Sequence, residues 1–171
     1  MAQDFSFDVV SEVDRNEVRN AVNLAQKEIA TRYDFKKSVS KVDLEGDDLV
    51  LVSDNEGKLH SVIDLLQEKL VRRKVPLKAL QYGKVEAALG GTVRQRVTVT
   101  HGIPDDKAKA VSKLVRDRFK KVKVQIQGDA VRVFSAKKDE LQAAMQALRD
   151  EDFGIPLQFT NYRCPGRGSR A

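Results

Sequence analysis

Tryptophan is absent from this chain of 171 residues, aromatic residues make up only 6% of it, and cysteine occurs once. Because Cys164 has no second cysteine to pair with, an internal disulfide framework and a cysteine-rich metal site are excluded. No apolar run approaches the roughly 18 residues that a membrane-spanning helix needs, and the N-terminus lacks a basic segment followed by an apolar one. We therefore expect a cytoplasmic protein that does not enter a membrane.

Motifs of the common catalytic sites are also missing. A P-loop needs a leading Gly, four further residues and then Gly-Lys-Ser/Thr. Here Gly57-Lys58 and Gly83-Lys84 are each followed by an aliphatic residue. His60 and His101 have no recognisable metal partner, and no base is positioned beside Cys164. We therefore expect no metal, no cofactor and no catalytic activity. The alternative is a hydrolase or phosphotransferase acting on nucleotides, with an active site assembled from distant residues.

The charge is unevenly distributed along the chain. The net charge of +6 combines −7 over residues 1–68, +14 over residues 69–138 and −1 over residues 139–171. A basic stretch of this kind favours an anionic partner, because neutralisation of phosphate is the sequence-independent part of nucleic-acid affinity.

The clearest local pattern lies between Lys121 and Phe134. Valine and isoleucine alternate with polar residues on both sides of Gly128-Asp129, which predicts an antiparallel hairpin with one buried and one solvated face. The solvated face has cations and amides but no carboxylate: Lys123, Gln125, Gln127 and Arg132. Such a face could hold phosphate by charge and base edges by amide hydrogen bonds. The alternative is an ordinary solvated sheet face.

The same order of elements occurs twice along the chain: strand, helix, strand, strand, helix, strand. The first copy has a strand from Phe5 to Val9, a helix from Asn16 that Asp14 caps, and a hairpin across Gly46. Residues match between the copies at offsets of 90 for the first strand, 82 for the hairpin and second helix, and 77 for the last strand. We expect units at residues 1–89 and 92–163, joined at Gly90-Gly91, and a flexible tail at residues 164–171.

This order predicts an α+β fold, a tandem duplication of the ferredoxin-like βαββαβ unit. In each unit two helices cover one face of a four-stranded antiparallel sheet and leave the other face open. RNA-recognition modules of this topology bind on the open face with stacked aromatics. Here the second half has Lys, Gln and Arg on its central strands instead.

Five segments resemble the YajQ family of small bacterial nucleotide-binding proteins: FDVVSEVD near the start, EIATRYDFK at residues 28–36, VRQ at 93–95, VQIQGDAVRV at 124–133 and PLQFTNYR at 156–163. The resemblance implies two ferredoxin-like domains whose N-terminal strands are exchanged. It also implies binding of nucleotides or RNA, with cyclic di-GMP as a ligand of some members, and no catalytic activity. Many members have Gly after the RYDFK segment, where this chain has Lys37, so we expect a different loop there.

Two groups of polar residues are the candidates for nucleotide binding. The first, which the resemblance supplies, is Arg32, Asp34 and Lys36, where the first helix gives way to the hairpin. Its alternative is a plain helix C-terminus with Tyr33 and Phe35 packed in the core. The second is Arg94 and Arg96, which we expect beside the Lys123, Gln125, Gln127 and Arg132 face. Because Arg can fork onto a phosphate or the N7/O6 edge of guanine, this second group could read a guanine nucleotide.

Further residues are weaker candidates. A basic cluster follows the second helix, and three aromatic residues could stack on bases, although strand aromatics are usually core residues: Lys69, Arg72, Arg73 and Lys74; Tyr82, Phe159 and Tyr162. The leading interpretation is a non-catalytic binder of a nucleotide, a cyclic dinucleotide or RNA. The alternative is a protein-interaction module, or a transcription-associated regulator, that docks a protein on its open sheet face.

Overall fold

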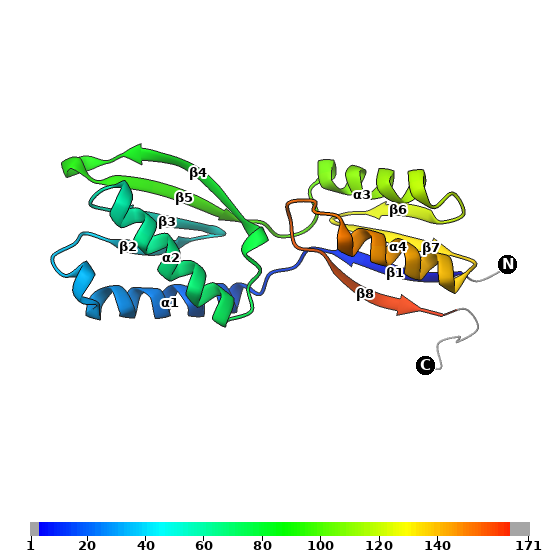
Figure 1. Ribbon diagram of the computed structural model, residues 1–171, viewed down its shortest axis with the longest axis horizontal. Helices are drawn as coiled ribbons and strands as arrows, with labels where there is room; N and C mark the ends of the chain where they lie inside the picture. Colours follow the sequence, from blue (N-terminus) through cyan, green and yellow to red (C-terminus); the bar gives the residue numbers. More distant parts are fainter. Residues whose placement is uncertain (1–3, 165–171) are drawn as a thin grey trace. The chain divides into compact units, whose positions relative to one another are not determined.

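The computed structural model describes residues 4–164 (Figure 1). Apart from Cys164, which is exposed, the predicted tail at residues 164–171 lies outside the described residues. The elements follow the predicted order: β1 (Phe5–Val10), α1 (Arg15–Thr31), η1 (Tyr33–Phe35), β2 (Lys41–Glu45), β3 (Asp48–Ser53), α2 (Glu56–Arg72), η2 (Leu77–Ala79), β4 (Leu80–Ala87), η3 (Leu89–Gly91), β5 (Val93–Val99), α3 (Asp105–Arg118), β6 (Lys123–Gln127), β7 (Ala130–Ser135), α4 (Lys138–Asp150) and β8 (Gln158–Arg163).

The strands form two four-stranded antiparallel sheets, which confirms the duplicated ferredoxin-like fold. One sheet has the order β6-β7-β1-β8 and the other the order β2-β3-β5-β4. The first strand of each sequence repeat therefore lies in the sheet of the other repeat. The expected exchange of N-terminal strands is confirmed: β1 pairs with β7 and β8, and β5 pairs with β3 and β4.

By contacts, the chain divides into two compact units. Unit 1 comprises the described residues of Met1–Glu12 and His101–Ala171, and unit 2 is Val13–Thr100. The sequence repeats at 1–89 and 92–163 divide the chain by order, whereas the compact units divide it by packing. The two divisions differ because β1 and β5 have changed places.

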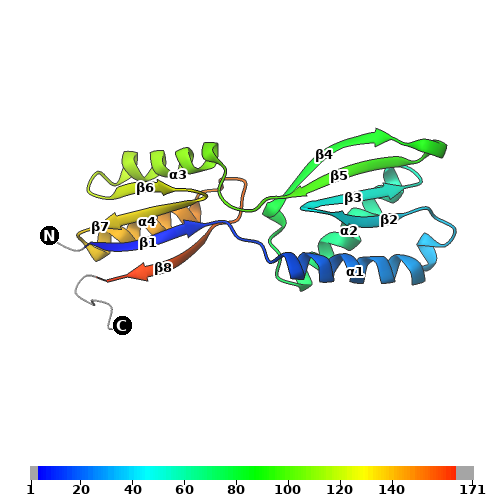
Figure 2. The same ribbon diagram turned by 180° about the vertical axis from the view of Figure 1, so that it is seen from behind.

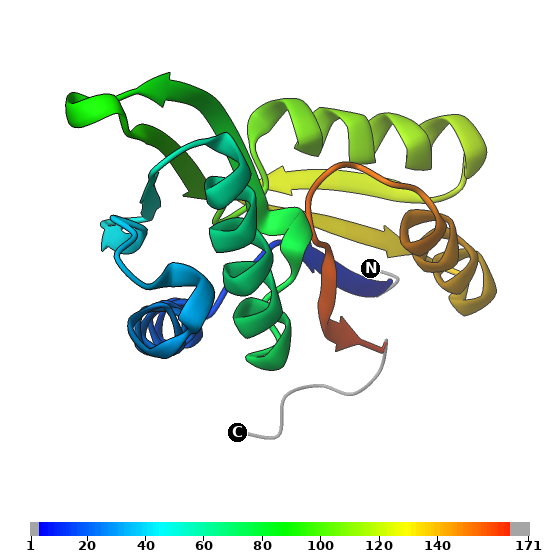
Figure 3. The same ribbon diagram turned by 60° about the vertical axis from the view of Figure 1, so that its left-hand side comes forward.

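Each unit has its own hydrophobic core on the helix side of its sheet. In unit 2, α1 and α2 cover the sheet with residues such as Val22 and Leu66, and Figure 2 shows β2 and β3 in front of α2. In unit 1, α3 and α4 supply Val111 and Leu148 to the core, and Figure 3 shows α3 running alongside β6. The other face of each sheet has no covering helix among the described residues.

Local sequence explains where the elements begin and turn. The Asp14 carboxylate accepts hydrogen bonds from the backbone N–H groups of Asn16 and Glu17, at 2.9 and 3.4 Å, as a helix N-cap does. Gly46 and Gly128 occupy the two hairpin turns with φ of 61° and 60°, a left-handed conformation that glycine adopts at no steric cost. Both predicted hairpins are therefore confirmed at the predicted turns.

Candidate functional site

The loop after α1 is held by an ion pair between two of the predicted site residues. Nε and Nη2 of Arg32 each lie 2.9 Å from a carboxylate oxygen of Asp34. The same guanidinium lies 5.3 Å from the ring centroid of Phe35, a cation–π contact. The hydrogen bonds from Arg32 hold the pKa of Asp34 below its usual value. Arg32 and Asp34 thus satisfy each other and fix the 3₁₀ turn η1.

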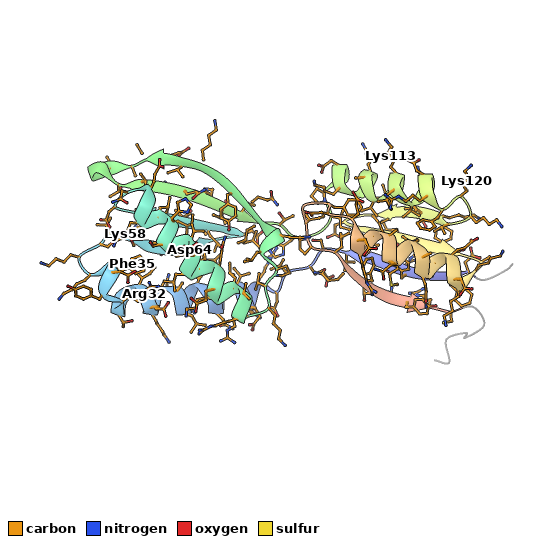
Figure 4. All side chains as sticks on the ribbon, viewed as in Figure 1. Arg32, Phe35, Lys58, Asp64, Lys113 and Lys120 are labelled. Atoms are coloured by element: carbon orange, nitrogen blue, oxygen red, sulfur yellow. The ribbon has the colours of Figure 1, made fainter. Side chains whose placement is uncertain are left out.

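A lysine from α2 also holds the loop. Lys58 donates a hydrogen bond from Nζ to the backbone carbonyl of Asp34, and the same Nζ lies 5.6 Å from the centroid of the Phe35 ring. Figure 4 shows Arg32, Phe35 and Lys58 beside one another at the end of α1. Buried Phe35 is therefore the anchor of the loop, and two cations, Arg32 and Lys58, contact its ring.

Tyr33 lies on the outside of this loop. Its side chain is 87% exposed, whereas Phe35 is 3% exposed. The alternative in which both aromatics pack in the core is thus confirmed for Phe35 and wrong for Tyr33, because the turn of η1 points these two side chains in different directions. Lys36 reaches over the exposed ring, with Nζ 6.0 Å from the centroid of Tyr33. An exposed ring beside a cation is an arrangement on which a base could stack.

A pocket of about 560 Å³ lies beside this loop, between α1 and the edge strand β2. Three lysines and one carboxylate, together with two hydroxyl groups, are among the side chains that line it: Lys36, Lys37, Lys41, Asp43, Ser38 and Ser40. Hydrogen bonds hold both hydroxyls in place: Ser40 Oγ lies 2.8 Å from Ser53 Oγ, and Ser38 donates to Asp54. The pocket therefore combines apolar lining residues, such as Ile29 and Val42, with a net positive charge.

Arg94 and Arg96 lie on the open face of the unit 2 sheet, as alternation along β5 predicted. Arg96 is held by two carboxylates, with Nη1 2.8 Å from Asp48 and Nη2 3.3 Å from Glu45. Hydrogen bonding to Arg96 lowers the pKa of Asp48. Exposed Arg94 has no ion-pair partner within residues 4–164, so of the two only Arg94 presents an uncompensated charge.

The hairpin of β6 and β7 presents the other predicted residues on the open face of the unit 1 sheet. Arg132 is not free there: its Nε and Nη2 lie 2.9 and 3.3 Å from the carboxylate of Asp8 on β1. Asn161 donates to the same carboxylate at 3.0 Å. The face has no carboxylate from the hairpin itself, but the neighbouring strand β1 supplies one. Three predicted residues remain exposed: Lys123, Gln125 and Gln127.

The nine predicted site residues do not form one surface. Arg94 and Arg96 belong to the β2-β3-β5-β4 sheet, whereas Lys123, Gln125, Gln127 and Arg132 belong to the β6-β7-β1-β8 sheet. The expectation that these two groups lie side by side on one face is therefore wrong. The exchange of β1 and β5 is the reason, because it places β5 in the sheet of the first repeat.

Sequence reasoning missed four residues of the loop and pocket: Tyr33, Lys37, Lys41 and Lys58. The sequence did contain a signal for Lys37 and Lys41, a local cluster of cations. Lys36 and Lys37 are adjacent, and Lys41 follows four residues after Lys37. Lys58 could not be assigned in this way, because it lies 24 residues from Asp34 in sequence and meets it only through the packing of α2 on α1.

The weaker candidates are mostly occupied by internal contacts. In the cluster after α2, the Lys69 side chain is 7% exposed and lies 3.4 Å from Glu28, while Arg72 and Arg73 pair with Glu68 and Glu17. Phe159 packs edge-on against Phe7, with centroids 5.6 Å apart. Tyr82 and Tyr162 remain partly exposed, and the Tyr82 hydroxyl accepts a hydrogen bond from Gln67 at 2.6 Å.

The described part of the chain has neither a metal-binding cluster nor a helix that could span a membrane. Within residues 4–164, no group of three or more His, Cys, Asp and Glu side chains is placed to hold a metal ion. None of the helices in that range is both long enough and apolar enough to cross a bilayer.

Comparison with known proteins identifies close relatives. The family model described as "Nucleotide-binding protein YajQ-like" matches residues 5–163. A protein of Desulfitobacterium hafniense named "Nucleotide-binding protein" is 54% identical over 163 residues, which cover 95% of this chain and 100% of the relative. A protein of Bacillus cereus, also named a nucleotide-binding protein, is 53% identical over the same share of both chains.

Proposed function

Because the chain belongs to the YajQ-like family of nucleotide-binding proteins, we propose that it binds a nucleotide without turning it over, at the loop and pocket between α1 and β2. One observation supports this placement above the others: an aromatic ring that is 87% exposed contacts Lys36, one of three lysines that line the pocket. A nucleotide offers the complementary parts, a flat base and an anionic phosphate.

In this proposal each side chain has a distinct role. Tyr33 stacks on the base, and Lys36, Lys37 and Lys41 neutralise phosphate. Asp43, which also lines the pocket, can accept hydrogen bonds from the N–H groups of a guanine base. Arg32 and Asp34 act as positioning residues, because their charges already satisfy each other. A guanine nucleotide, either a mononucleotide or cyclic di-GMP, fits these groups best.

The other predicted residues take second place as nucleotide ligands. Arg96 and Arg132 would have to exchange a carboxylate at 2.8 or 2.9 Å for a phosphate, so each contact starts with a cost. Arg94 and Lys123 are free of such pairs among residues 4–164 but lie in different units. The docking of a protein partner on an open sheet face is the second function we consider. Protein docking is less favoured because charged and amide side chains lie on the open faces of both sheets.

The test is a titration of the purified, nuclease-treated protein with fluorescent GTP and cyclic di-GMP. We expect Tyr33→Ala to weaken binding by roughly 5- to 100-fold through lost stacking, and the triple variant Lys36→Gln/Lys37→Gln/Lys41→Gln to weaken it at least about 10-fold through lost charge. The matched control is Arg19→Gln/Lys84→Gln/Lys138→Gln, which removes the same charge from exposed positions outside the predicted sites.

Equal loss of affinity in the control and the pocket variant would overturn the pocket as the site. Binding of neither nucleotide by the wild-type protein would overturn the proposed ligand class. Absence of turnover is checked separately by incubating each nucleotide with the protein and separating the products. Steady product formation that a pocket variant abolishes would show an enzyme instead.

A further inference from the structure

A second pocket of unit 2 is lined by residues of α2, the edge strand β4 and its neighbour β5. Its volume is about 380 Å³, which is within the usual range for small-molecule sites. Leu59, Ile63 and Val85 give it apolar walls, and the ring of Tyr82 also lines it. The Tyr82 hydroxyl accepts a hydrogen bond from Gln67 at 2.6 Å, which holds the ring in place. The pocket can therefore enclose a flat apolar group.

Gln95, on β5, is a buried polar residue that lines this pocket. The residue is 7% exposed, and its Nε2 donates a hydrogen bond to the backbone carbonyl of Gly83 at 2.9 Å. Because a carbonyl can only accept, the amide nitrogen must face Gly83 and Oε1 must face elsewhere. Within residues 4–164, Oε1 is buried and has no hydrogen-bond partner. An unpaired buried acceptor costs free energy, so a donor on a ligand in this pocket would stabilise it.

A β-bulge in β4 builds this arrangement. Between the pairs that Tyr82 and Val85 make with β5, β4 has one more residue than β5. A Cβ on Gly83, inside the bulge, would lie 2.9 Å from the carbonyl oxygen of Arg96, so a larger residue does not fit there. The bulge thus places the Gly83 carbonyl against the amide of Gln95.

The pocket also has two carboxylates. Glu56 and Asp64 line it from α2, and His60 is the only basic side chain among the described residues that line it. Neither carboxylate has an ion-pair partner within residues 4–164. The helix dipole favours Glu56 in the first turn of α2 but not Asp64, the ninth residue, which Figure 4 shows on that helix. The pocket therefore attracts a cation, whereas the pocket beside β2 attracts an anion.

The duplicated fold provides an internal comparison. At the offset of 90, Gln95 corresponds to Phe5, a partly buried residue that packs on the core of unit 1. At the offset of 82, Asp64 corresponds to Gln146 and Glu56 to a lysine. The fold therefore accepts an apolar residue in place of the buried amide and requires neither carboxylate.

We propose that this pocket binds a small organic cation with a flat apolar body and a neutral N–H donor, groups that arylalkylammonium compounds can combine. The ammonium group pairs with Glu56 and Asp64, and the N–H group donates to Oε1 of Gln95. The apolar body lies against the aliphatic walls and the Tyr82 ring. A nucleotide suits the pocket poorly, because its phosphate would meet two carboxylates. The residues that line this pocket include none of those that line the proposed nucleotide pocket.

The test uses tryptamine as the probe, since it has a ring N–H group at one end and an ammonium group at the other. Because the chain has no tryptophan, indole fluorescence reports the probe alone. We expect the full chain to shift the emission of tryptamine to shorter wavelengths as the ring enters apolar surroundings.

Two analogues that compete with tryptamine test the two polar contacts in the wild-type protein. The benzothiophene analogue has sulfur in place of the ring N–H, and we expect it to bind roughly 2- to 10-fold more weakly. Indole-3-propionate has a carboxylate in place of the ammonium, and we expect it to bind at least about 10-fold more weakly.

Variants test the same contacts from the side of the protein. Gln95→Leu removes the acceptor, so it should bind tryptamine and the benzothiophene analogue equally. Glu56→Gln/Asp64→Asn should weaken tryptamine binding by roughly 10-fold. The matched control, Glu86→Gln/Asp117→Asn, removes the same charge from exposed carboxylates that have no ion pair within residues 4–164 and should change little.

Circular dichroism checks that each variant is folded, and the two analogues on the wild-type protein decide the contacts if a variant is not. Absence of a spectral shift at millimolar tryptamine would overturn the proposal. Equal affinities of tryptamine and the benzothiophene analogue would overturn the contact with Gln95, and equal losses in the carboxylate and control variants would overturn the cation site. GTP and cyclic di-GMP are titrated in parallel: displacement of tryptamine by either would show a nucleotide site instead, whereas unchanged nucleotide affinity in the carboxylate variant separates the two pockets.

Discussion

At the scale of single residues, the pair of Asp8 and Arg132 links pH to stability. The hydrogen bonds from Arg132 hold the pKa of Asp8 below its ordinary value of 3.8, although burial opposes them. Because the folded chain lowers this pKa, ionised Asp8 stabilises the folded state fully above 3.8, and that stabilisation is lost as the pH falls through the lower folded value. We expect Asp8→Asn to lower the free energy of unfolding by about 1 to 3 kcal/mol at neutral pH.

Urea denaturation at neutral pH, and again below the folded pKa of Asp8, checks this expectation. The difference between wild type and variant should shrink in acid, where both side chains are neutral. Asp117→Asn, an exposed carboxylate on α3, is the control and should change little at either pH. A difference that stays constant with pH would show that Asp8 acts through packing rather than charge.

This pair also shows how far sequence reasoning reaches at a single residue. Alternation along β7 places Arg132 on the solvated face correctly, because it depends only on local periodicity. Its partner is 124 residues away in sequence, on a strand whose sheet periodicity does not reveal. The interpretation of Arg132 as a free phosphate ligand therefore stays a prediction. Binding of phosphate would require Arg132 to give up its ion pair with Asp8, which costs free energy.

Lys37 combines a strained backbone with a charge at the proposed pocket. Its φ of 61° lies in the left-handed region, which costs a residue with a Cβ about 1 kcal/mol relative to glycine. We expect Lys37→Gly to leave the free energy of unfolding unchanged or to raise it by up to about 1 kcal/mol, while nucleotide affinity falls because a cation is lost. Thermal denaturation and nucleotide titration of one preparation test both parts. Unchanged affinity would remove Lys37 from the site, and a clear loss of stability would contradict the strain.

At the scale of elements, the two repeats begin their second helices differently. Asn55 caps α2, and its Oδ1 accepts a hydrogen bond from the backbone N–H of Lys58 at 2.8 Å. The equivalent position of α4, at the offset of 82, is Lys137, whose side chain makes no capping bond. We expect Lys137→Asn to raise the free energy of unfolding by about 0.5 to 1 kcal/mol.

The control for the cap is Lys138→Asn, one residue further along, which removes the same charge at a position that cannot cap. A gain confined to Lys137→Asn in urea denaturation would support the cap. Equal gains in the two variants would instead show that removing a cation near the helix N-terminus is enough.

Elements were the part of the structure that sequence predicted best. Hydrophobic periodicity and turn residues such as Gly46 and Gly128 depend on neighbours in the chain, so they identified the order, the hairpins and the duplication. The candidate site was harder to predict. Its parts are side chains such as Tyr33 and Lys58, which differ between the repeats and meet only through tertiary packing.

At the scale of the whole molecule, the exchange of β1 and β5 is accompanied by contacts that only β1 can make in unit 1. The strands match at an offset of 90, so Phe5, Phe7 and Asp8 of β1 correspond to Gln95, Val97 and Thr98 of β5. In unit 1, Phe7 packs on Phe159 and Asp8 pairs with Arg132, and β5 has neither an aromatic ring nor a carboxylate to replace them. We therefore infer that the unit 1 sheet favours β1 over β5, a form of specificity by packing and charge.

This selection gives a prediction about fragments of the chain. Residues 13–100 contain all four strands and both helices of unit 2, so this fragment should unfold cooperatively by itself. Residues 101–164 lack β1, the strand between β7 and β8, and should not fold alone because the sheet is interrupted at its centre.

Adding a peptide of residues 4–12 should restore a cooperative transition. The control peptide, residues 92–100, supplies β5 and should restore it much less. Circular dichroism during urea denaturation measures each case. Equal rescue by the two peptides would show that the sheet accepts either strand, and that the covalent order of the chain, rather than Phe7 and Asp8, directs the exchange.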